Sequence, residues 1–159
     1  MVYMISGKAG AGKDTAFALI KELLPSVERF AFADSLKETA KSLGWDGEKD
    51  EKGRKFLQNL GNIVRDYGED IWANIVAGKI LQCTSQTQVI TDWRFPNEFK
   101  VINEYFSPVV TINIVGRAYD LGNNGNDISE HALEGFKFDY VIDNSGTIAE
   151  FRQKLLGVI

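Results

Sequence analysis

Several features that mark particular classes of protein are scarce or missing in this sequence. Cys83 is the only cysteine among 159 residues, so no internal disulfide can form and we expect a buried structural thiol. The longest apolar run, Val109–Val115, is far too short to span a bilayer. The first residues carry neither a basic stretch nor a long apolar one, so they do not resemble a signal peptide. We therefore expect a cytoplasmic protein without a membrane partner.

Basic charge is also scarce. The chain has 18 Lys and Arg against 22 Asp and Glu, a net charge of -4, and it shows no basic patch that would follow a nucleic-acid backbone, so we expect no polymeric nucleic acid as a partner. Free nucleotides stay open as ligands, because a few well-placed cations suffice for them. The 44% hydrophobic and 25% charged residues are typical of a globular protein.

What the sequence does contain is an alternation of strand-like and helix-like segments. Short apolar runs predict strands, and apolar residues at helical spacing predict helices. The expected strands are Val2–Ser6, Val27–Ala33, Gln88–Thr91, Val109–Val115 and Tyr140–Ile142; the expected helices are Lys13–Leu24, Ser35–Leu43 with Asp34 as its cap, Gly53–Tyr67, Ile71–Gln82, one that starts near Pro96, and Thr147–Leu156. This order predicts an α/β fold, a central parallel sheet of about five strands with helices on both faces. We expect one domain over residues 1–159, with inserts at about 45–72 and 116–130.

A glycine-rich segment lies where the first strand gives way to the first helix. It reads GKAGAGKDT over Gly7–Thr15, and its G-x-x-x-x-G-K spacing lets successive backbone amides point at phosphate oxygens beside a helix N-terminus. Lys13 would reach the β and γ phosphates of a nucleotide. The expected phosphate-binding residues are Gly7, Ala9, Gly10, Ala11, Gly12, Lys13, Asp14 and Thr15. The segment therefore predicts ATP or GTP binding and a three-layer P-loop NTPase fold, and the lack of an Asn-Lys-x-Asp motif weakens the GTPase interpretation.

One position departs from the commonest form of this loop. The hydroxyl residue that usually follows the lysine and helps to hold Mg²⁺ is replaced by Asp14, with Thr15 one place later. Asp14 either contacts Mg²⁺ through a water or simply occupies a first helical turn, where negative charge is favourable. We take Asp14, Thr15 and Asp92 as the candidate magnesium ligands.

Candidate residues for a second ligand follow the second and third strands. Asp92 and Arg94 come at the end of the third strand, at the edge where open α/β sheets bind ligands. A carboxylate there can position hydrated Mg²⁺ or an attacking oxygen, and an arginine can hold a phosphate with two parallel hydrogen bonds. Asp34 ends the second strand, where it can bond an acceptor sugar, cap its helix, or do both.

The expected helix Gly53–Tyr67 has a polar face as well as an apolar stripe. Gln58, Asn62 and Arg65 recur at i, i+4 and i+7 and so lie on one side. Two amides beside one arginine suit a ligand with a base to read and a phosphate to hold, although a solvated polar face is the commoner explanation. Trp72 and Phe32 are candidates for stacking on a base, although most such aromatic residues belong to a core.

The segment after the fourth strand begins with Arg117 and continues through a Gly- and Asn-rich stretch. An arginine carried by a closing lid can stabilise the charge of a phosphoryl group in transfer, and about 10³–10⁵ in rate is attributed to such a residue. The composition suits a mobile lid or a plain surface loop. His131, the only histidine, is interpreted as a surface or helix-terminal residue.

Taken together these segments resemble the deoxynucleoside monophosphate kinases of tailed bacteriophages, a branch of the P-loop nucleotide kinases. The resemblance lies in Gly7–Thr15 (GKAGAGKDT), Phe32–Lys37 (FADSLK), Arg54–Arg65 (RKFLQNLGNIVR), Asp70–Trp72, Thr91–Glu98 (TDWRFPNE), Ser129-Glu130 and Phe138–Asn144 (FDYVIDN). It implies ATP- and Mg²⁺-dependent conversion of a dNMP to a dNDP, a lid over ATP and a helical insert around the acceptor, in a host cytoplasm. The G-K-D-T and S-E signatures also look like those of animal phosphomevalonate kinases.

The predicted mechanism follows from these placements. Lys13 and the loop amides hold ATP, Arg65 and Arg94 hold the acceptor phosphate, and Arg117 closes over the transferring group. The alternatives are a kinase of another phosphorylated metabolite, of the phosphomevalonate or dephospho-coenzyme A type, and a regulator that binds ATP without catalysis. The helices at 53–67 and 71–82 are also candidates for pairing with a second copy in a homodimer.

Overall fold

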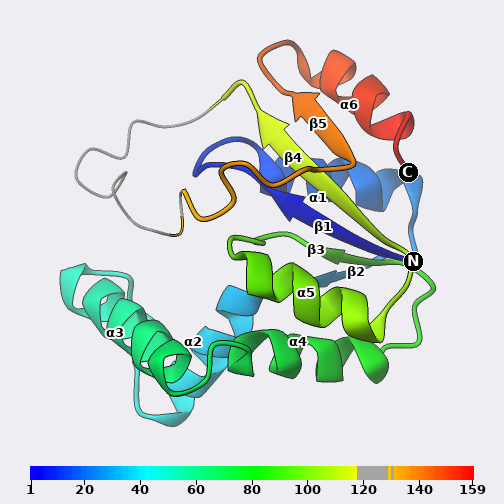
Figure 1. Ribbon diagram of the computed structural model, residues 1–159. Coiled ribbons are helices and arrows are strands. Elements are labelled where there is room, and N and C mark those ends of the chain that lie inside the picture. The colour runs from blue at the N-terminus through cyan, green and yellow to red at the C-terminus, as the bar shows by residue number, and fades with distance from the viewer. Residues whose placement is uncertain (118–128, 130) are drawn as a thin grey trace.

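The computed structural model describes residues 1–117, 129 and 131–159. At its centre lies one parallel sheet (Figure 1). Its strands are β1 (Val2–Ser6), β2 (Glu28–Phe30), β3 (Gln88–Ile90), β4 (Val109–Val115) and β5 (Tyr140–Asp143), in the order β2-β3-β1-β4-β5. The first strand thus lies at the centre of the sheet. The glycine-rich segment follows it directly and therefore lies in the middle of the row formed by the carboxyl ends of the strands.

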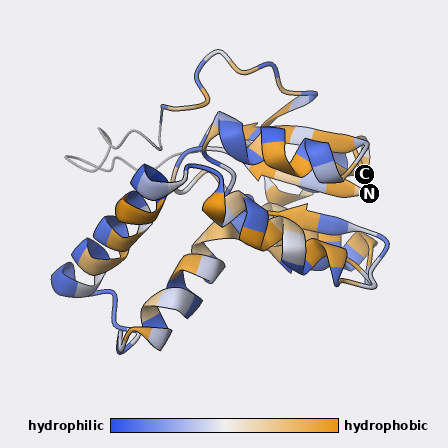
Figure 2. Cartoon of the chain, turned by 60° about the horizontal axis from the view of Figure 1, so that its bottom comes forward, coloured by the Kyte–Doolittle hydropathy of each residue, from blue (hydrophilic) through white to orange (hydrophobic). Residues whose placement is uncertain are grey.

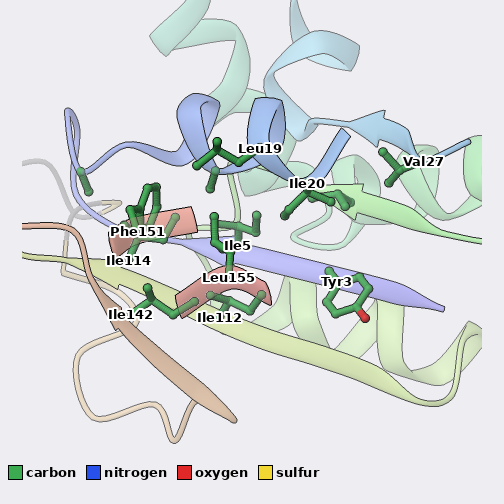
Figure 3. Packing of buried hydrophobic residues seen from close by; sticks show 13 residues of the cluster. Tyr3, Ile5, Leu19, Ile20, Val27, Ile112, Ile114, Ile142, Phe151 and Leu155 are labelled. Atoms are coloured by element: carbon green, nitrogen blue, oxygen red, sulfur yellow. The ribbon is translucent and has the colours of Figure 1, made fainter. Parts of the chain in front are cut away.

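Two helices cover one face of the sheet. They are α1 (Lys13–Leu23) and α6 (Ile148–Leu156), and their apolar side chains meet those of β1, β4 and β5 in one hydrophobic core. Figure 3 shows this packing, with Ile20 of α1 and Phe151 and Leu155 of α6 set against Ile5, Ile112 and Ile114 of the strands. Because α1 is held along its length, its N-terminus is fixed relative to the end of β1.

The other face is covered by α4 (Ile71–Leu81) and α5 (Pro96–Tyr105). Here Met4 and Ile90 of the sheet pack under a buried Trp93, which is surrounded by the rings of Phe99, Phe136 and Phe138. The rings lie 4.8 to 5.8 Å from Trp93, the range of favourable aromatic pairs. This cluster ties the segment before β5 to the start of α5.

Two further helices, α2 (Phe32–Ser42) and α3 (Glu51–Tyr67), extend beyond the sheet at its carboxyl edge (Figure 1). α3 begins after Asp50, whose side chain accepts a 2.7 Å hydrogen bond from the amide of Gly53. It packs on α2 and on α4, and Gly61 is the position at which Leu36 of α2 comes close. The helix is therefore anchored on one side and exposed on the others.

The predicted order of elements is confirmed, and so is the parallel five-stranded sheet with helices on both faces. Two details were wrong. The second strand covers only Glu28–Phe30, because the helix expected at Ser35 already begins at Phe32. Asp34 is not its cap, since it lies within the first turn and the N-cap is Ala31. The insert expected at 45–72 comprises a turn and α3, and most of the one expected at 116–130 lies outside the described residues.

No helix in the described part of the chain is long and apolar enough to cross a membrane.

Candidate active site

The glycine-rich segment forms a tight loop between β1 and α1. Gly7, Gly10 and Gly12 have φ of 146°, 78° and 104°, a region that side chains disfavour. A Cβ on Gly7 would lie 2.5 Å from the carbonyl oxygen of Ile114, and one on Gly12 would collide with the side chain of Asn144. Gly7 and Gly12 therefore require glycine for the backbone angle and for the space, and Gly10 requires it for the backbone angle, as expected of a phosphate-binding loop of this spacing.

Lys13 is the first residue of α1 and stays folded against this loop. Its ammonium donates to the carbonyl oxygens of Gly7 (2.6 Å) and Lys8 (3.0 Å). The helix that it opens has Gly12 as its N-cap and no side-chain cap, so a lysine charge and helix-end amides lie together where an anion is favoured. The structure thus brings together Gly7, Gly12 and Lys13 as the sequence predicted.

A buried residue that the sequence interpretation did not single out holds the loop in place. Asn144, 5% exposed, follows β5 and donates a 2.9 Å hydrogen bond from Nδ2 to the carbonyl oxygen of Ala11. The contact joins two segments 133 positions apart. Since Gly12 lies directly against the same amide, Asn144 fixes the middle of the loop. The FDYVIDN segment contains this residue, but no local pattern points to its partner.

Asp92 follows β3 and is turned toward α2. Its Oδ1 accepts from the amide of Phe32 (2.9 Å) and its Oδ2 from the amide of Ala33 (2.8 Å). Burial raises the pKa of the Asp92 carboxyl above its ordinary value, and the two amide hydrogen bonds from Ala33 and Phe32 oppose that rise. The side chain of Asp92 therefore caps the first amides of α2, a role that the sequence had suggested for Asp34. Asp34 instead pairs with Arg29 and, at 3.3 Å, with Lys37.

Arg94 and Arg117 border the same cavity as the loop. This cavity has a volume of about 480 Å³ and opens at the carboxyl edge of the sheet. Four segments line it besides Arg94 and Ser129. They are the glycine-rich loop (Ser6, Gly7, Lys8, Ala11), the end of β4 (Asn113–Val115), the two residues after it (Gly116, Arg117), and the segment before β5 together with Val141. Arg94 Nη1 donates to Ser129 Oγ at 3.1 Å. Arg117 Nη2 donates to the carbonyl oxygen of Gly146 at 2.5 Å. The rest of the predicted lid, apart from Gly116, Arg117 and Ser129, lies outside the described residues.

The polar face of α3 meets the segment after β3 at Phe95. The guanidinium of Arg65 lies 4.6 Å from the centroid of the Phe95 ring, a cation–π distance. Its Nη1 lies 3.5 Å from Asn62 Oδ1, so Asn62 and Arg65 are neighbours as the spacing predicted. Gln58 is exposed on the same face. The side chain of Arg65 therefore contacts Phe95, the residue directly after Arg94.

One buried carboxylate organises this corner. Glu98 in the first turn of α5 is 4% exposed, and its Oε2 accepts from the amides of Arg94 (2.9 Å) and Phe95 (3.0 Å). Burial raises the pKa of Glu98 to about 7, against the two amide hydrogen bonds and the charge of Arg65, while the charge of Asp92 adds to the rise. The sequence predicted no role for Glu98. It occupies the position of the Glu in a capping box, but the N-cap is Phe95 and not Ser, Thr, Asp or Asn, so the local signal is incomplete.

The two aromatic residues proposed for base stacking are structural. Trp72 is 4% exposed and Phe32 is 5% exposed. The indole N–H of Trp72 donates to the carbonyl oxygen of Gly61 at 3.3 Å and so ties α4 to α3. Neither ring leaves enough open surface for a base, and that prediction was wrong. His131 is a surface residue paired with Glu134 at 2.6 Å, as expected.

The loop fits a triphosphate, and the carboxylates fit Mg²⁺ to different degrees. Among residues 1–117, 129 and 131–159, no group of three or more acidic, His or Cys side chains is placed to hold a metal. The Mg²⁺ that accompanies a nucleotide takes most ligands from phosphates and water and only one or two carboxylates from the protein. Asp14 and Thr15 are exposed in the first turn of α1 and fit that need. Asp92 fits it less well, because both of its oxygens already accept amide hydrogens.

Comparison with known proteins gives a match in structure alone. No protein-family model and no curated protein sequence matches the chain. Among solved structures, shikimate kinase from Aquifex aeolicus is 14% identical, with a TM-score of 0.59 and coverage of 98% of this chain and 94% of that one. TT1252 from Thermus thermophilus is 12% identical with a TM-score of 0.62, covering 99% and 94% of the two chains.

A third structure, shikimate kinase from Acinetobacter baumannii in complex with shikimate, is 12% identical with a TM-score of 0.55 and coverage of 99% and 90%. At these identities the similarity concerns the arrangement of the backbone. The parallel sheet, its strand order and the glycine-rich loop at the end of its central strand agree with that similarity, and the chain has the fold of the P-loop kinases.

Proposed function

We propose that this chain is an ATP-dependent kinase that transfers the terminal phosphate of ATP to a deoxynucleoside monophosphate. The observation that carries the proposal is a single cavity bordered by the phosphate-binding loop and by two arginines, Arg94 and Arg117. A nucleotide-binding regulator would need the loop alone. A phosphoryl-transfer site needs in addition cations around a second anion and around the group in transfer, because catalysis there is mostly positioning and charge stabilisation.

The engaged carboxylates favour a phosphate as the acceptor. A hydroxyl acceptor profits from a nearby carboxylate that takes its proton, as in the protein kinases. Here Asp34 is paired with Arg29 and Lys37, and the two oxygens of Asp92 accept two amides. An acceptor phosphate is already anionic and loses no proton at the attacking oxygen. It therefore needs no carboxylate as a base, and it suits a site in which Asp34 and Asp92 are engaged in ion pairs and hydrogen bonds.

The residues divide into two groups by position. Lys13, the loop amides and the N-terminus of α1 would hold the β and γ phosphates of ATP. Arg94 and Arg65, connected through Phe95, would hold the acceptor phosphate, and Gln58 and Asn62 beside Arg65 would read the base. Arg117 would stabilise the negative charge on the transferring group. Asp14 or Thr15, with Asp92 as a further candidate, would hold Mg²⁺, whose charge would neutralise part of that of the ATP phosphates.

The structural neighbours are compatible with this assignment of ATP. One of them, APS kinase CysC from Mycobacterium tuberculosis, was solved with AMPPNP and APS, and is 11% identical with a TM-score of 0.50 and coverage of 98% and 95%. The nucleotide acceptor itself rests on the resemblance of Gly7–Thr15, Arg54–Arg65 and Thr91–Glu98 to the phage deoxynucleoside monophosphate kinases. The phosphomevalonate and dephospho-coenzyme A types stay as alternatives.

The test is an acceptor panel in a coupled assay of ADP formation. The four common dNMPs, the corresponding NMPs, phosphomevalonate and dephospho-coenzyme A are compared at saturating ATP and Mg²⁺. We expect ADP to form only with an acceptor and fastest with one or more dNMPs. ADP formation only with phosphomevalonate or dephospho-coenzyme A would reassign the acceptor, and none with any of them would favour the regulator.

Two variants then separate the halves of the site. Lys13→Ala should nearly abolish turnover, because the charge at the β and γ phosphates is lost. Arg65→Ala should chiefly raise the KM for the acceptor and leave the KM for ATP nearly unchanged. Arg54→Ala, which removes an exposed arginine from the same helix, is the matched control. Equal acceptor KM values in the Arg65 and Arg54 variants would remove Arg65 from the site.

A further inference from the structure

α3 carries an exposed apolar stripe on the side away from its polar face. Phe56, Leu60, Ile63 and Tyr67 recur at i, i+4, i+7 and i+11 and so form one line along the helix. Three of them are open to solvent, at 37% for Phe56, 66% for Ile63 and 90% for Tyr67. Gln58, Asn62 and Arg65 follow the stripe residues by two positions, which is about 200° around a helix. The stripe is therefore not part of the candidate active site.

The stripe lies on a helix that is itself packed against the rest of the chain. A third side of α3, with Gly53 and Gly61 buried, already packs on α2 and α4. Banded apolar and polar colouring runs along the projecting helix in Figure 2. With roughly 200 Å² of surface for a large side chain, the three exposed fractions leave about 400 Å² of apolar surface per chain. That is about half of what each partner buries in an ordinary stable complex.

Unpaired charges lie at the two ends of the stripe, and they have opposite signs. Lys52 and Lys55 lie in the first turns of α3, while Asp66 lies in its last turn and Glu69 follows the C-cap Gly68. In the described part of the chain none of these four side chains has an ion-pair partner. The helix also carries Glu51 in its first turn and Arg65 in its last turn, so its two ends differ in charge along only part of its surface. Lys55 and Asp66 are eleven positions apart, about three turns, and so lie on the same side of the helix.

We propose that the stripe on α3 binds the same stripe of a second copy of this chain, antiparallel about a two-fold axis. In that arrangement Leu60 lies opposite Ile63 of the other copy and Phe56 opposite Tyr67. The lysine end of each helix then lies beside the acidic end of the other, so both sets of charges gain partners. A two-fold axis makes one surface complementary to itself, which is the commonest form of homodimer.

The pairing uses α3 and not α4. The sequence left both helices open, but α4 buries Trp72, Ala73, Val76, Ala77 and Ile80 against its own chain. The modest apolar area of the α3 stripe places this dimer among the weak interfaces, so it should dissociate on dilution. The dimer does not depend on phosphoryl transfer, because the stripe and the polar face of α3 point in different directions.

The first experiment is sedimentation velocity of the full chain over a wide concentration range. The wild type should change from monomer to dimer as concentration rises. Ile63→Lys should raise the dissociation constant by at least tenfold, because it puts a charge in the middle of the interface. Ile63 is 66% exposed, so circular dichroism should show an unchanged fold. Leu81→Lys, at the equally exposed end of α4 (61%), is the control and should dimerise as the wild type does.

The second experiment tests the antiparallel orientation. Lys55→Glu and Asp66→Lys should each weaken the dimer several-fold, since like charges then face each other. The double variant Lys55→Glu/Asp66→Lys should recover most of the loss, because the swapped charges meet again only when the helices run antiparallel. A chain that stays monomeric to millimolar concentration, or a dimer indifferent to Ile63→Lys, would overturn the proposal. Additive losses in the double variant would overturn the orientation.

Discussion

Glu98 offers the sharpest physical test of the corner that holds Arg94 and Phe95. Its carboxyl is 4% exposed, and burial raises its pKa to about 7 from an ordinary value of 4.5. A shift of this size corresponds to about 3 kcal/mol of differential stability between the two protonation states. The direction is fixed by linkage. Because the folded chain binds this proton more tightly than the unfolded chain, the contribution is complete below pH 4.5 and is lost as the pH rises to about 7.

The perturbation is Glu98→Gln, which keeps the size of the side chain and one oxygen acceptor but cannot titrate. Free energies of unfolding in urea are measured for wild type and variant at several pH values between 4 and 8. The stability of the variant minus that of the wild type should rise by up to about 3 kcal/mol across this range. Asp92, whose pKa is also raised, contributes in the same direction in both proteins and largely cancels in the difference.

Glu104→Gln is the matched control, since Glu104 is exposed on the same helix. Its difference from the wild type should stay nearly flat with pH. A flat difference for Glu98→Gln as well would refute the reasoning. It would mean that the amides of Arg94 and Phe95 compensate fully for burial, so that Glu98 titrates as an exposed carboxyl does.

Three further predictions concern the contacts that shape the site. Asp92→Asn should lower the free energy of unfolding by about 1–3 kcal/mol in urea titrations, because its amide nitrogen cannot accept from Phe32 or Ala33. Asn144→Ala should cost a similar amount and weaken ATP binding in calorimetry, since the Ala11 carbonyl loses its buried donor. Gly7→Ala should nearly eliminate ATP binding and destabilise the fold by about 1–3 kcal/mol, because its φ of 146° is strained for alanine. For the first two variants, unchanged stability in denaturant would contradict the structural roles; for the third, unchanged ATP affinity would do so.

Much of the fold and the phosphate-binding loop could be predicted from the sequence because their signals are local. The loop is defined by glycine and lysine spacing within nine residues, and each strand or helix is visible as its own hydrophobic pattern. Asp34 shows where this reasoning stops. Its position after a strand is typical of a helix cap, but the cap of α2 comes from Asp92, about sixty residues later. Nothing in either local sequence indicates that pairing.

The role predicted for Trp72 was wrong and the role of Asn144 was not predicted, and both have the same cause. A tryptophan near a polar helix face suggests a stacking surface, but its exposure depends on how α3 and α4 pack, and here its N–H is bonded to Gly61. Asn144 lies in a strand-end segment that looks like an ordinary turn. It can bond to Ala11 only because the end of β5 lies beside the glycine-rich loop. Side-chain roles that depend on contacts between distant segments need the structure.

The arrangement of carboxylates and arginines at the sheet edge has a common logic. In an open α/β site the carboxylates near the strand ends are the obvious candidates for chemistry, but here both oxygens of Asp92 and the Oε2 of Glu98 accept hydrogen bonds from backbone amides. The effect is to fix the start of α2 and the Arg94–Phe95 segment, and through the Phe95 ring to support Arg65. Guanidinium groups need orientation to bind a phosphate with two parallel bonds, and a rigid backbone supplies it without adding anions to the cavity. A site that must attract a phosphate gains more from carboxylates used as buried caps than from carboxylates facing the ligand.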